Sequence, residues 1–89
     1  MSSSEPGRAK FYYNLGLAYQ AMGQNESAIE GYDQAIRLNP EYSAAYNNRG
    51  NVYHDLGEHQ LAIGDYDEAV RLNPEYSAAY NNRGNVYHD

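Results

Sequence analysis

Hydrophobic positions along the chain recur every three or four residues, which is the spacing of one face of a helix. In the first stretch Tyr12, Leu15 and Tyr19 share such a face, with Gly16 beside them. A second face is made by Ala28, Ile29, Tyr32, Ala35, Ile36 and Leu38. The strict alternation typical of β-strands is absent from the sequence. The pattern therefore predicts an all-α chain built from pairs of helices.

Turn residues separate these helices at regular places. Gly23 and Gly57 stand where the first helix of each pair must end and the chain must reverse. Asn39–Pro40 and Asn73–Pro74 end the second helix of each pair, because the residue before a proline avoids helical dihedral angles. We therefore expect helix–turn–helix units.

The units repeat with a period of 34 residues. The stretch EYSAAYNNRGNVYHD occurs at 41–55 and again, unchanged, at 75–89. Residues 9–40 match 43–74 at 14 of 32 positions, so the first unit has diverged from the second. Either a recent duplication or deliberate engineering explains the unchanged copy, and the sequence does not separate the two.

This period divides the chain into four parts. Residues 1–8 are predicted to be a disordered tail, and 9–40 and 41–74 to be full units of two helices each. Residues 75–89 are predicted to be the first helix of a third unit, packed on the second helix of unit two. The expected total is five helices.

The repeated residues resemble the tetratricopeptide repeat. In the first unit its signature places hold Tyr12, Leu15, Gly16, Tyr19, Ala28, Tyr32, Ala35 and Pro40. The later units supply Tyr46, Gly50, Tyr53, Ala62, Tyr66, Ala69 and Pro74, then Tyr80, Gly84 and Tyr87. Arg49 and Arg83 depart from the signature, since the family usually has a large apolar residue there. The resemblance implies antiparallel helix hairpins stacked as a right-handed α-solenoid, whose first helices line a concave groove.

Composition narrows the range of functions. The chain has no cysteine, which excludes disulfides and thiol catalysis, and its 12 Asp and Glu outnumber its 6 Lys and Arg. An acidic chain is a poor partner for nucleic acid, because that affinity comes from clustered basic residues. No apolar run approaches the roughly 20 residues that span a bilayer, and the N-terminus lacks a signal-peptide pattern. We therefore expect a cytoplasmic protein that binds neither nucleic acid nor membrane.

No group of residues has the arrangement of an active site. His54, Asp55 and His59 lie near a predicted helix end, and we interpret them as solvated turn residues rather than metal ligands. Asp65 and Asp67 are interpreted as an exposed helix face rather than a catalytic pair. The chain is therefore expected to hold no metal or cofactor and not to be an enzyme.

Asparagines indicate what the implied groove would bind. Asn14, Asn48 and Asn82 each stand two residues before the glycine of a first helix, which makes a ladder with one carboxamide per unit. A carboxamide offers both donor and acceptor, so it can pair with the main chain of an extended peptide. The flanking positions assigned to the same peptide site are Tyr13, Asn47, Asn51, Asn81 and Asn85. The alternative, that these are ordinary exposed polar residues, stays open.

One use of such a groove does not fit this sequence. Chaperone-tail binders of the family use a carboxylate clamp of lysine, arginine and asparagine, and the resemblance matches its places to Tyr13, Leu17, Asn48, Ala78 and Asn82. Only Asn48 fits. Without a cation in the clamp, an acidic peptide C-terminus lacks its anchor.

The last helix supports a second hypothesis from a different class. As a copy of 41–55 it carries the face that elsewhere receives a following helix. We assign self-association to four residues of it, Tyr80, Arg83, Val86 and Tyr87. The two hypotheses are thus a peptide- or protein-binding module and a self-associating scaffold, as a homodimer or a domain-swapped oligomer.

Overall fold

Helices make up the whole architecture of the part of the chain that the structure describes. The computed structural model describes the backbone of residues 5–88 and the side chains of residues 7–85. The helices are α1 (Glu5–Ala21), α2 (Asn25–Leu38), α3 (Ser43–Asp55), α4 (His59–Leu72) and α5 (Ser77–His88). The predicted five-helix, all-α repeat is confirmed within these residues.

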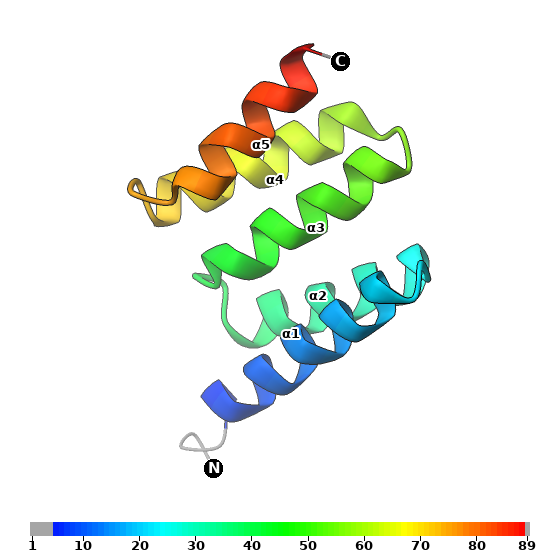
Figure 1. Cartoon of the computed structure of the whole chain (residues 1–89). Coiled ribbons are helices and arrows are strands. Elements are labelled where there is room, and N and C mark those ends of the chain that lie inside the picture. The colour runs from blue at the N-terminus through cyan, green and yellow to red at the C-terminus, as the bar shows by residue number, and fades with distance from the viewer. Residues whose placement is uncertain (1–4, 89) are drawn as a thin grey trace.

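The helices form a stack of antiparallel hairpins. α1 packs on α2 and α3 packs on α4, while α5 lies against α4 as expected. Contacts between α1 and α3, and between α3 and α5, join the first helices of successive units. The start of α1 and the end of α5 lie at opposite ends of this elongated stack (Figure 1), which measures 44 × 29 × 16 Å.

The start of α1 differs from the sequence-based boundary. We expected a disordered tail over residues 1–8, but α1 begins at Glu5 and residues 5–8 are helical. Residues 1–4 of the expected tail lie outside the described residues. Arg8 is exposed whereas Ala9 is only 1% exposed, so the first packed side chain among those that the structure describes falls at the predicted start of unit one.

Two kinds of turn connect the helices, as the sequence predicts. Gly23 and Gly57 have φ angles of 75° and 81°, in the left-handed region where a glycine has no steric penalty. At the other turns Asn39 and Asn73 each accept a hydrogen bond at Oδ1 from the backbone N–H two residues later. This local bond stabilises the reversal that the following proline begins.

The core is built from small residues on one helix and a tyrosine on its partner. Tyr32 of α2 is fully buried against Gly16 of α1, and Tyr66 of α4 is 1% exposed against Gly50 of α3. A Cβ atom added to Gly16 would lie 2.6 Å from Cε1 of Tyr32. Each hairpin therefore closes only because glycine leaves room for the aromatic ring.

Candidate functional site

The predicted asparagine ladder lies across the first helices of the three units. Asn14 on α1 is exposed, while Asn48 on α3 and Asn82 on α5 are half-buried. Nδ2 of Asn48 donates to the hydroxyl of Tyr13 at 2.8 Å. Nδ2 of Asn82 donates to Oδ1 of Asn47 at 3.1 Å. The side chains of Asn48 and Asn82 thus each bind the first helix of the preceding unit.

These bonds leave part of each ladder carboxamide available to a ligand. A carboxamide has two N–H donors and an oxygen with two acceptor positions. Asn48 uses one donor on Tyr13, and its oxygen lies 3.5 Å from Nδ2 of Asn51, which is a long contact. Asn48 therefore retains a donor and acceptor capacity that a peptide main chain can use.

The flanking asparagines occupy different environments. Asn47 is 4% exposed, so its side chain faces the packed interior and supports Asn82 more than it offers surface to a ligand. Oδ1 of Asn51 accepts a hydrogen bond from the hydroxyl of Tyr66, which ties it into its own hairpin. Asn81 and Asn85 on α5 are exposed.

Tyrosines form the floor beside Asn48. The ring of Tyr13 stacks on that of Tyr42 with centroids 4.9 Å apart, and it lies 5.9 Å from that of Tyr32. Burial, followed by the nearby Tyr76 and Tyr42, raises the pKa of Tyr13 above its usual value of 10.0. Tyr13 is therefore a neutral phenol at physiological pH. In the bond to Asn48 its oxygen is the acceptor, so its O–H can still donate to another group.

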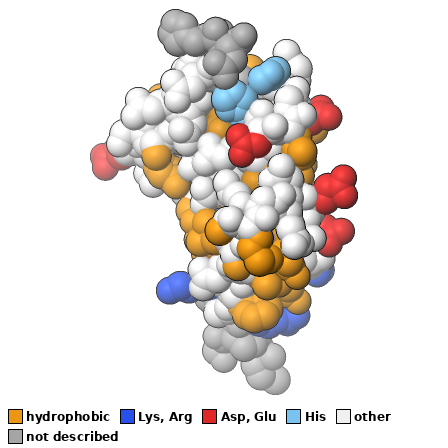
Figure 2. Space-filling model, turned by 45° about the vertical axis from the view of Figure 1, so that its right-hand side comes forward, with side chains coloured by type: hydrophobic (Ala, Val, Ile, Leu, Met, Phe, Trp, Pro, Cys, Tyr) orange, Lys and Arg blue, Asp and Glu red, His pale blue; other side chains and the backbone are white. Residues whose placement is uncertain are grey.

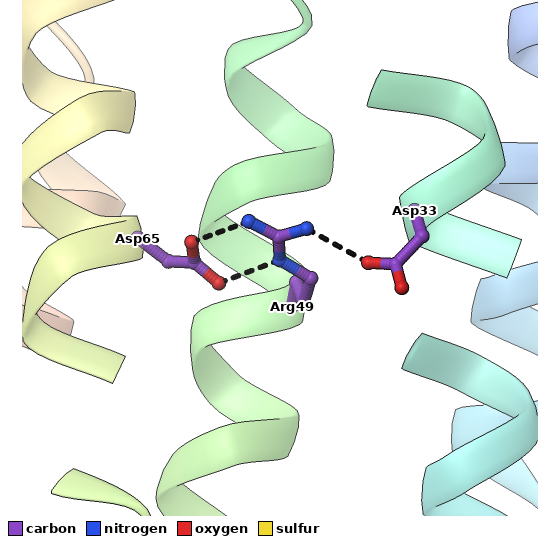
Figure 3. Close-up of polar contacts among 3 residues, drawn as sticks. All are labelled: Asp33, Arg49 and Asp65. Carbon is purple, nitrogen blue, oxygen red and sulfur yellow. Dashed lines mark hydrogen bonds and ion pairs between the residues drawn. The ribbon is translucent and has the colours of Figure 1, made fainter. Parts of the chain in front are cut away.

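Arg49 of α3 joins three helices, because it binds one aspartate on α4 and another on α2. Nε and Nη2 of Arg49 each donate to a carboxylate oxygen of Asp65 at 2.8 Å, and Nη1 donates to Asp33 at 2.8 Å (Figure 3). Burial opposes the charge on Arg49, but the bonds to Asp65 and Asp33 outweigh it and raise its pKa. The rings of Tyr46 and Tyr53 lie 5.4 and 5.8 Å from its guanidinium carbon.

The sequence-based interpretation of Asp65 as an exposed residue is wrong. Asp65 is 7% exposed overall, and its carboxylate is held in a bidentate ion pair. Asp67 does lie at the surface, where it pairs with Arg83 at 2.8 Å. A signal for Asp65 was present, since Arg49 replaces a large apolar residue of the family signature and aspartates stand 16 residues on either side of it.

A hollow of about 400 Å³ is lined by residues of α1 and α2, and Asn14 is not among them. Its lining residues are Tyr12, Leu15, Tyr19, Ser27, Glu30, Gly31, Asp33 and Gln34. In the second hairpin the equivalents of Leu15 and Gly31 are Arg49 and Asp65, and their ion pair lies between α3 and α4. The hollow thus lies beside the place where the second hairpin has its ion pair.

Exposed large hydrophobic side chains occur in both hairpins and on α5, and three of them belong to the first hairpin. Phe11 and Met22 are each 60% exposed and Leu17 is 38% exposed. On the face in Figure 2, hydrophobic side chains gather in the half of the molecule nearer the N-terminus. Leu17 stands at one of the places that match the carboxylate clamp, so this place on α1 presents an exposed apolar side chain.

The predicted self-association residues lie on α5. Tyr80 is 42% exposed, and the guanidinium carbon of Arg83 lies 5.3 Å from the centre of its ring. The side chains of Val86 and Tyr87 lie outside the described residues. The described part of this face thus presents a tyrosine and an arginine.

No described group of residues resembles a metal site or a membrane span. Among the side chains that the structure describes, no three or more of His, Cys, Asp or Glu come together to hold a metal ion. The rings of His54 and His59 lie 5.3 Å apart beside the turn at Gly57. None of the described helices has the length and apolar character needed to cross a bilayer.

Comparison with known proteins identifies the fold. A family model described as tetratricopeptide repeat matches residues 13–77. A crystal structure of MamA protein is similar, with 35% identity and a TM-score of 0.88. That match covers 93% of this chain and 45% of that one, so the chain spans less than half of that MamA chain. Among curated protein sequences, none matches this chain significantly.

Two further solved structures are tetratricopeptide domains by name. The Arabidopsis OM64 TPR domain has 25% identity and a TM-score of 0.91, covering 94% of this chain and 69% of that one. The first TPR of Spaghetti (RPAP3), bound to HSP90 peptide SRMEEVD, has 28% identity and a TM-score of 0.89, covering 92% and 67%. The chain belongs to the tetratricopeptide repeat family, an all-α helical-repeat fold whose units mediate protein–protein interaction.

Proposed function

We propose that the chain binds a peptide in extended conformation along the face made by α1, α3 and α5. The observation that carries this proposal is the row of carboxamides at Asn14, Asn48 and Asn82, one on each of these helices. Bonds to Tyr13 and Asn47 hold Asn48 and Asn82 in place. A donor and an acceptor fixed in position can pair with a peptide main chain at little cost in side-chain entropy.

The chemistry of this face favours a neutral or basic peptide. The places that match a carboxylate clamp hold Tyr13, Leu17, Asn48, Ala78 and Asn82, and none is a cation. The chain carries a net charge of −6, which repels an acidic ligand. We therefore expect the acidic peptide SRMEEVD, which is bound to the similar Spaghetti domain, not to bind here.

A peptide selection tests this proposal. The full chain would be used to select from a phage library of random linear peptides, and the selected peptides measured by fluorescence anisotropy. Asn14→Ala should weaken their binding by about tenfold, because one exposed main-chain partner is lost. Gln60→Ala, which removes an exposed carboxamide from α4, serves as the matched control and should leave binding unchanged.

The triple variant Asn14→Ala, Asn48→Ala, Asn82→Ala should abolish binding, with thermal unfolding measured in parallel because Asn48 and Asn82 also join helices. Selected peptides that bind this variant as tightly as the original chain would contradict the proposal. Tight binding of SRMEEVD would contradict the inference about ligand charge.

Self-association through α5 is a second candidate function. The exposure of Tyr80 favours it, since an exposed aromatic side chain is typical of a contact surface. Sedimentation across a wide concentration range should then show a mass rising toward twice that of the monomer, and Tyr80→Glu should prevent the rise. A monomer at every concentration would leave peptide binding as the proposed function.

The remaining sequence-based expectations stay predictions. They are the absence of enzymatic activity, the cytoplasmic location, the absence of nucleic-acid and membrane partners, and the origin of the repeated stretch by duplication or engineering. The net charge of −6 supports the expectation that nucleic acid is not a partner, because affinity for a phosphate backbone comes from clustered basic residues.

A further inference from the structure

Three tyrosines from separate parts of the chain come together beside Asn48. Tyr13 lies on α1, whereas Tyr42 and Tyr76 are the residues that directly precede α3 and α5. The rings of Tyr13 and Tyr42 are stacked, with centroids 4.9 Å apart and planes 30° from parallel. Tyr76 lies close enough to Tyr13 to contribute, after burial, to the rise of its pKa. All three residues are half-buried, so they form a tyrosine surface that is partly open to solvent.

The tyrosine surface offers hydrogen-bond donors as well as rings. Nδ2 of Asn48 donates to the hydroxyl oxygen of Tyr13 at 2.8 Å, which leaves the O–H of Tyr13 to donate elsewhere. Asn48 keeps a second N–H, because a carboxamide has two. An apolar ligand that carries carbonyl oxygens therefore suits both the rings and the donors.

An aromatic ring is not needed for the bond that joins these two first helices. One repeat period later, Asn47 takes the place of Tyr13, and Asn82 donates to it at 3.1 Å as Asn48 donates to Tyr13. The same bond is thus made with a carboxamide as the acceptor. Tyr13 adds to the junction of the first and second units an aromatic surface that this bond does not require.

We propose that the ligand of the asparagine face is a proline-rich peptide in the polyproline II conformation, held at the tyrosine surface. This inference rests on the proposed function, because it names the ligand class of the same face. Proline-rich segments bind to surfaces lined by aromatic side chains, and their preformed conformation loses little entropy on binding. Proline has no backbone N–H but keeps its carbonyl oxygen, which can accept from Tyr13 or Asn48.

Charge also favours such a ligand, because proline is neutral. Burial raises the pKa of Tyr13 and of Tyr42, so both phenols are uncharged at physiological pH. The neighbours that influence the pKa of Tyr13 are Tyr76, Tyr42 and Asn48, and none of them is charged at that pH. We therefore expect the affinity for a proline-rich peptide to change little with salt concentration.

Fluorescein-labelled decaproline, titrated with the full chain and followed by anisotropy, tests the inference. We expect saturable binding, about tenfold or more tighter than that of an equally long labelled peptide of Gly–Ser repeats. Tyr13→Asn should weaken the binding of decaproline by about tenfold, because it removes the ring. This variant installs the residue of the next unit, which still gives Asn48 an acceptor.

Two further variants separate the ring from other causes. Tyr13→Phe keeps the packed ring but lacks the O–H donor, so it should weaken binding by a smaller factor, about threefold to fivefold. It also provides the test if circular dichroism shows that Tyr13→Asn is unfolded. Tyr80→Asn is the matched control, since Tyr80 is an exposed tyrosine of α5 outside the tyrosine surface, and it should leave binding unchanged.

The outcomes distinguish this inference from the proposed function. If decaproline fails to bind while selected peptides without proline bind and lose affinity on Asn14→Ala, the inference is overturned and the proposed function stands. Decaproline that binds folded Tyr13→Asn as tightly as it binds the original chain also overturns the inference, because it then binds elsewhere. If neither decaproline nor any selected peptide binds, the proposed function fails and the inference fails with it.

Discussion

The two hairpins of this molecule close the same seam by different means. In the first, Gly31 brings the backbones so close that an added Cβ would lie 2.9 Å from the amide nitrogen of Gly16. In the second, the equivalent position is Asp65, and its carboxylate holds Arg49 in a bidentate ion pair. Leu15 and Arg49 are likewise equivalent. One fold thus accepts a close backbone contact or an ion pair at the same place.

This difference indicates that the position of Leu15 or Arg49 and the position of Gly31 or Asp65 act as a pair. A buried ion pair contributes little net stability compared with apolar packing, but removing one partner leaves an uncompensated charge. Arg49 opposite a glycine would lack its carboxylate partner, and an aspartate opposite Leu15 would be buried without a cation. The pairs should therefore be exchangeable only together.

The largest expected effect comes from breaking the pair in the second hairpin. Arg49→Leu should reduce the free energy of unfolding by about 3–5 kcal/mol, because it leaves the Asp65 carboxylate buried without its partner. Adding Asp65→Gly should recover most of that loss by installing the pair of the first hairpin. Urea unfolding followed by circular dichroism measures both variants. A double variant no more stable than Arg49→Leu would show that the positions are not coupled.

High pH should weaken the contact that the two hairpins share. Burial, with Asp55 and Asp65 nearby, raises the pKa of Tyr66 from 10.0 to about 12, and burial raises the pKa of Tyr32 as well. Between these values the unfolded chain releases the phenol proton while the folded chain keeps it. The stability due to Tyr66 is therefore complete below about pH 10 and falls by about 3 kcal/mol as the pH passes 12.

Chemical unfolding at a series of pH values from neutral to alkaline measures this decline. Tyr66→Phe keeps the ring but has no titrating hydroxyl, so its stability should fall less steeply with pH than that of the original chain. Equal slopes for the two proteins would contradict the assignment of the pKa shift to Tyr66.

A methyl group should be tolerated differently by the two hairpins. Gly31→Ala should cost about 1–3 kcal/mol, because the atoms it would meet are backbone atoms of α1 that cannot rotate away. Gly64→Ala, at a helical glycine with open space, should instead stabilise the chain by about 0.5–1 kcal/mol. Thermal unfolding compares the two, and a Gly31→Ala variant as stable as Gly64→Ala would mean that the hairpin relaxes.

The smallest expected effect concerns the outer partner of Arg49. The side chain of Asp33 is 49% exposed, against 9% for that of Asp65. Asp33→Ala should therefore cost no more than about 1 kcal/mol, and less at high salt, because water and ions screen an exposed pair. Urea unfolding at low and high salt provides the measurement. A loss as large as that of Arg49→Leu would make Asp33 an equal member of the ion pair.

Much of the fold could be predicted because it depends on local rules. The helical spacing, Gly23, Gly57 and the Asn–Pro turns locate the five helices and their order. The start of α1 was placed too late, because Pro6 and Gly7 are typical of a tail and yet fall in its first turn, where a proline is tolerated.

The sequence places the candidate asparagines on the first helices, but it does not give the contacts that they make. Asn48 and Asn82 bond to residues 35 positions earlier, and such bonds depend on how neighbouring units pack. Asp65 was missed for the same reason, since a charged residue on an amphipathic helix usually faces solvent. Its burial follows from Arg49, which belongs to another helix.

The pairing of Arg49 with aspartates on both neighbouring helices restricts which unit can follow another in such a repeat array. Asp33 and Asp67 each reach forward to the arginine of the unit after their own. Asp67 meets Arg83 because α5 repeats the stretch that carries Arg49, whereas a copy of the first unit at that place would bring Leu15 and leave Asp67 facing an apolar neighbour. Which unit can follow another thus depends on this ion pair. The stretch that recurs unchanged in the sequence is the one that carries the arginine.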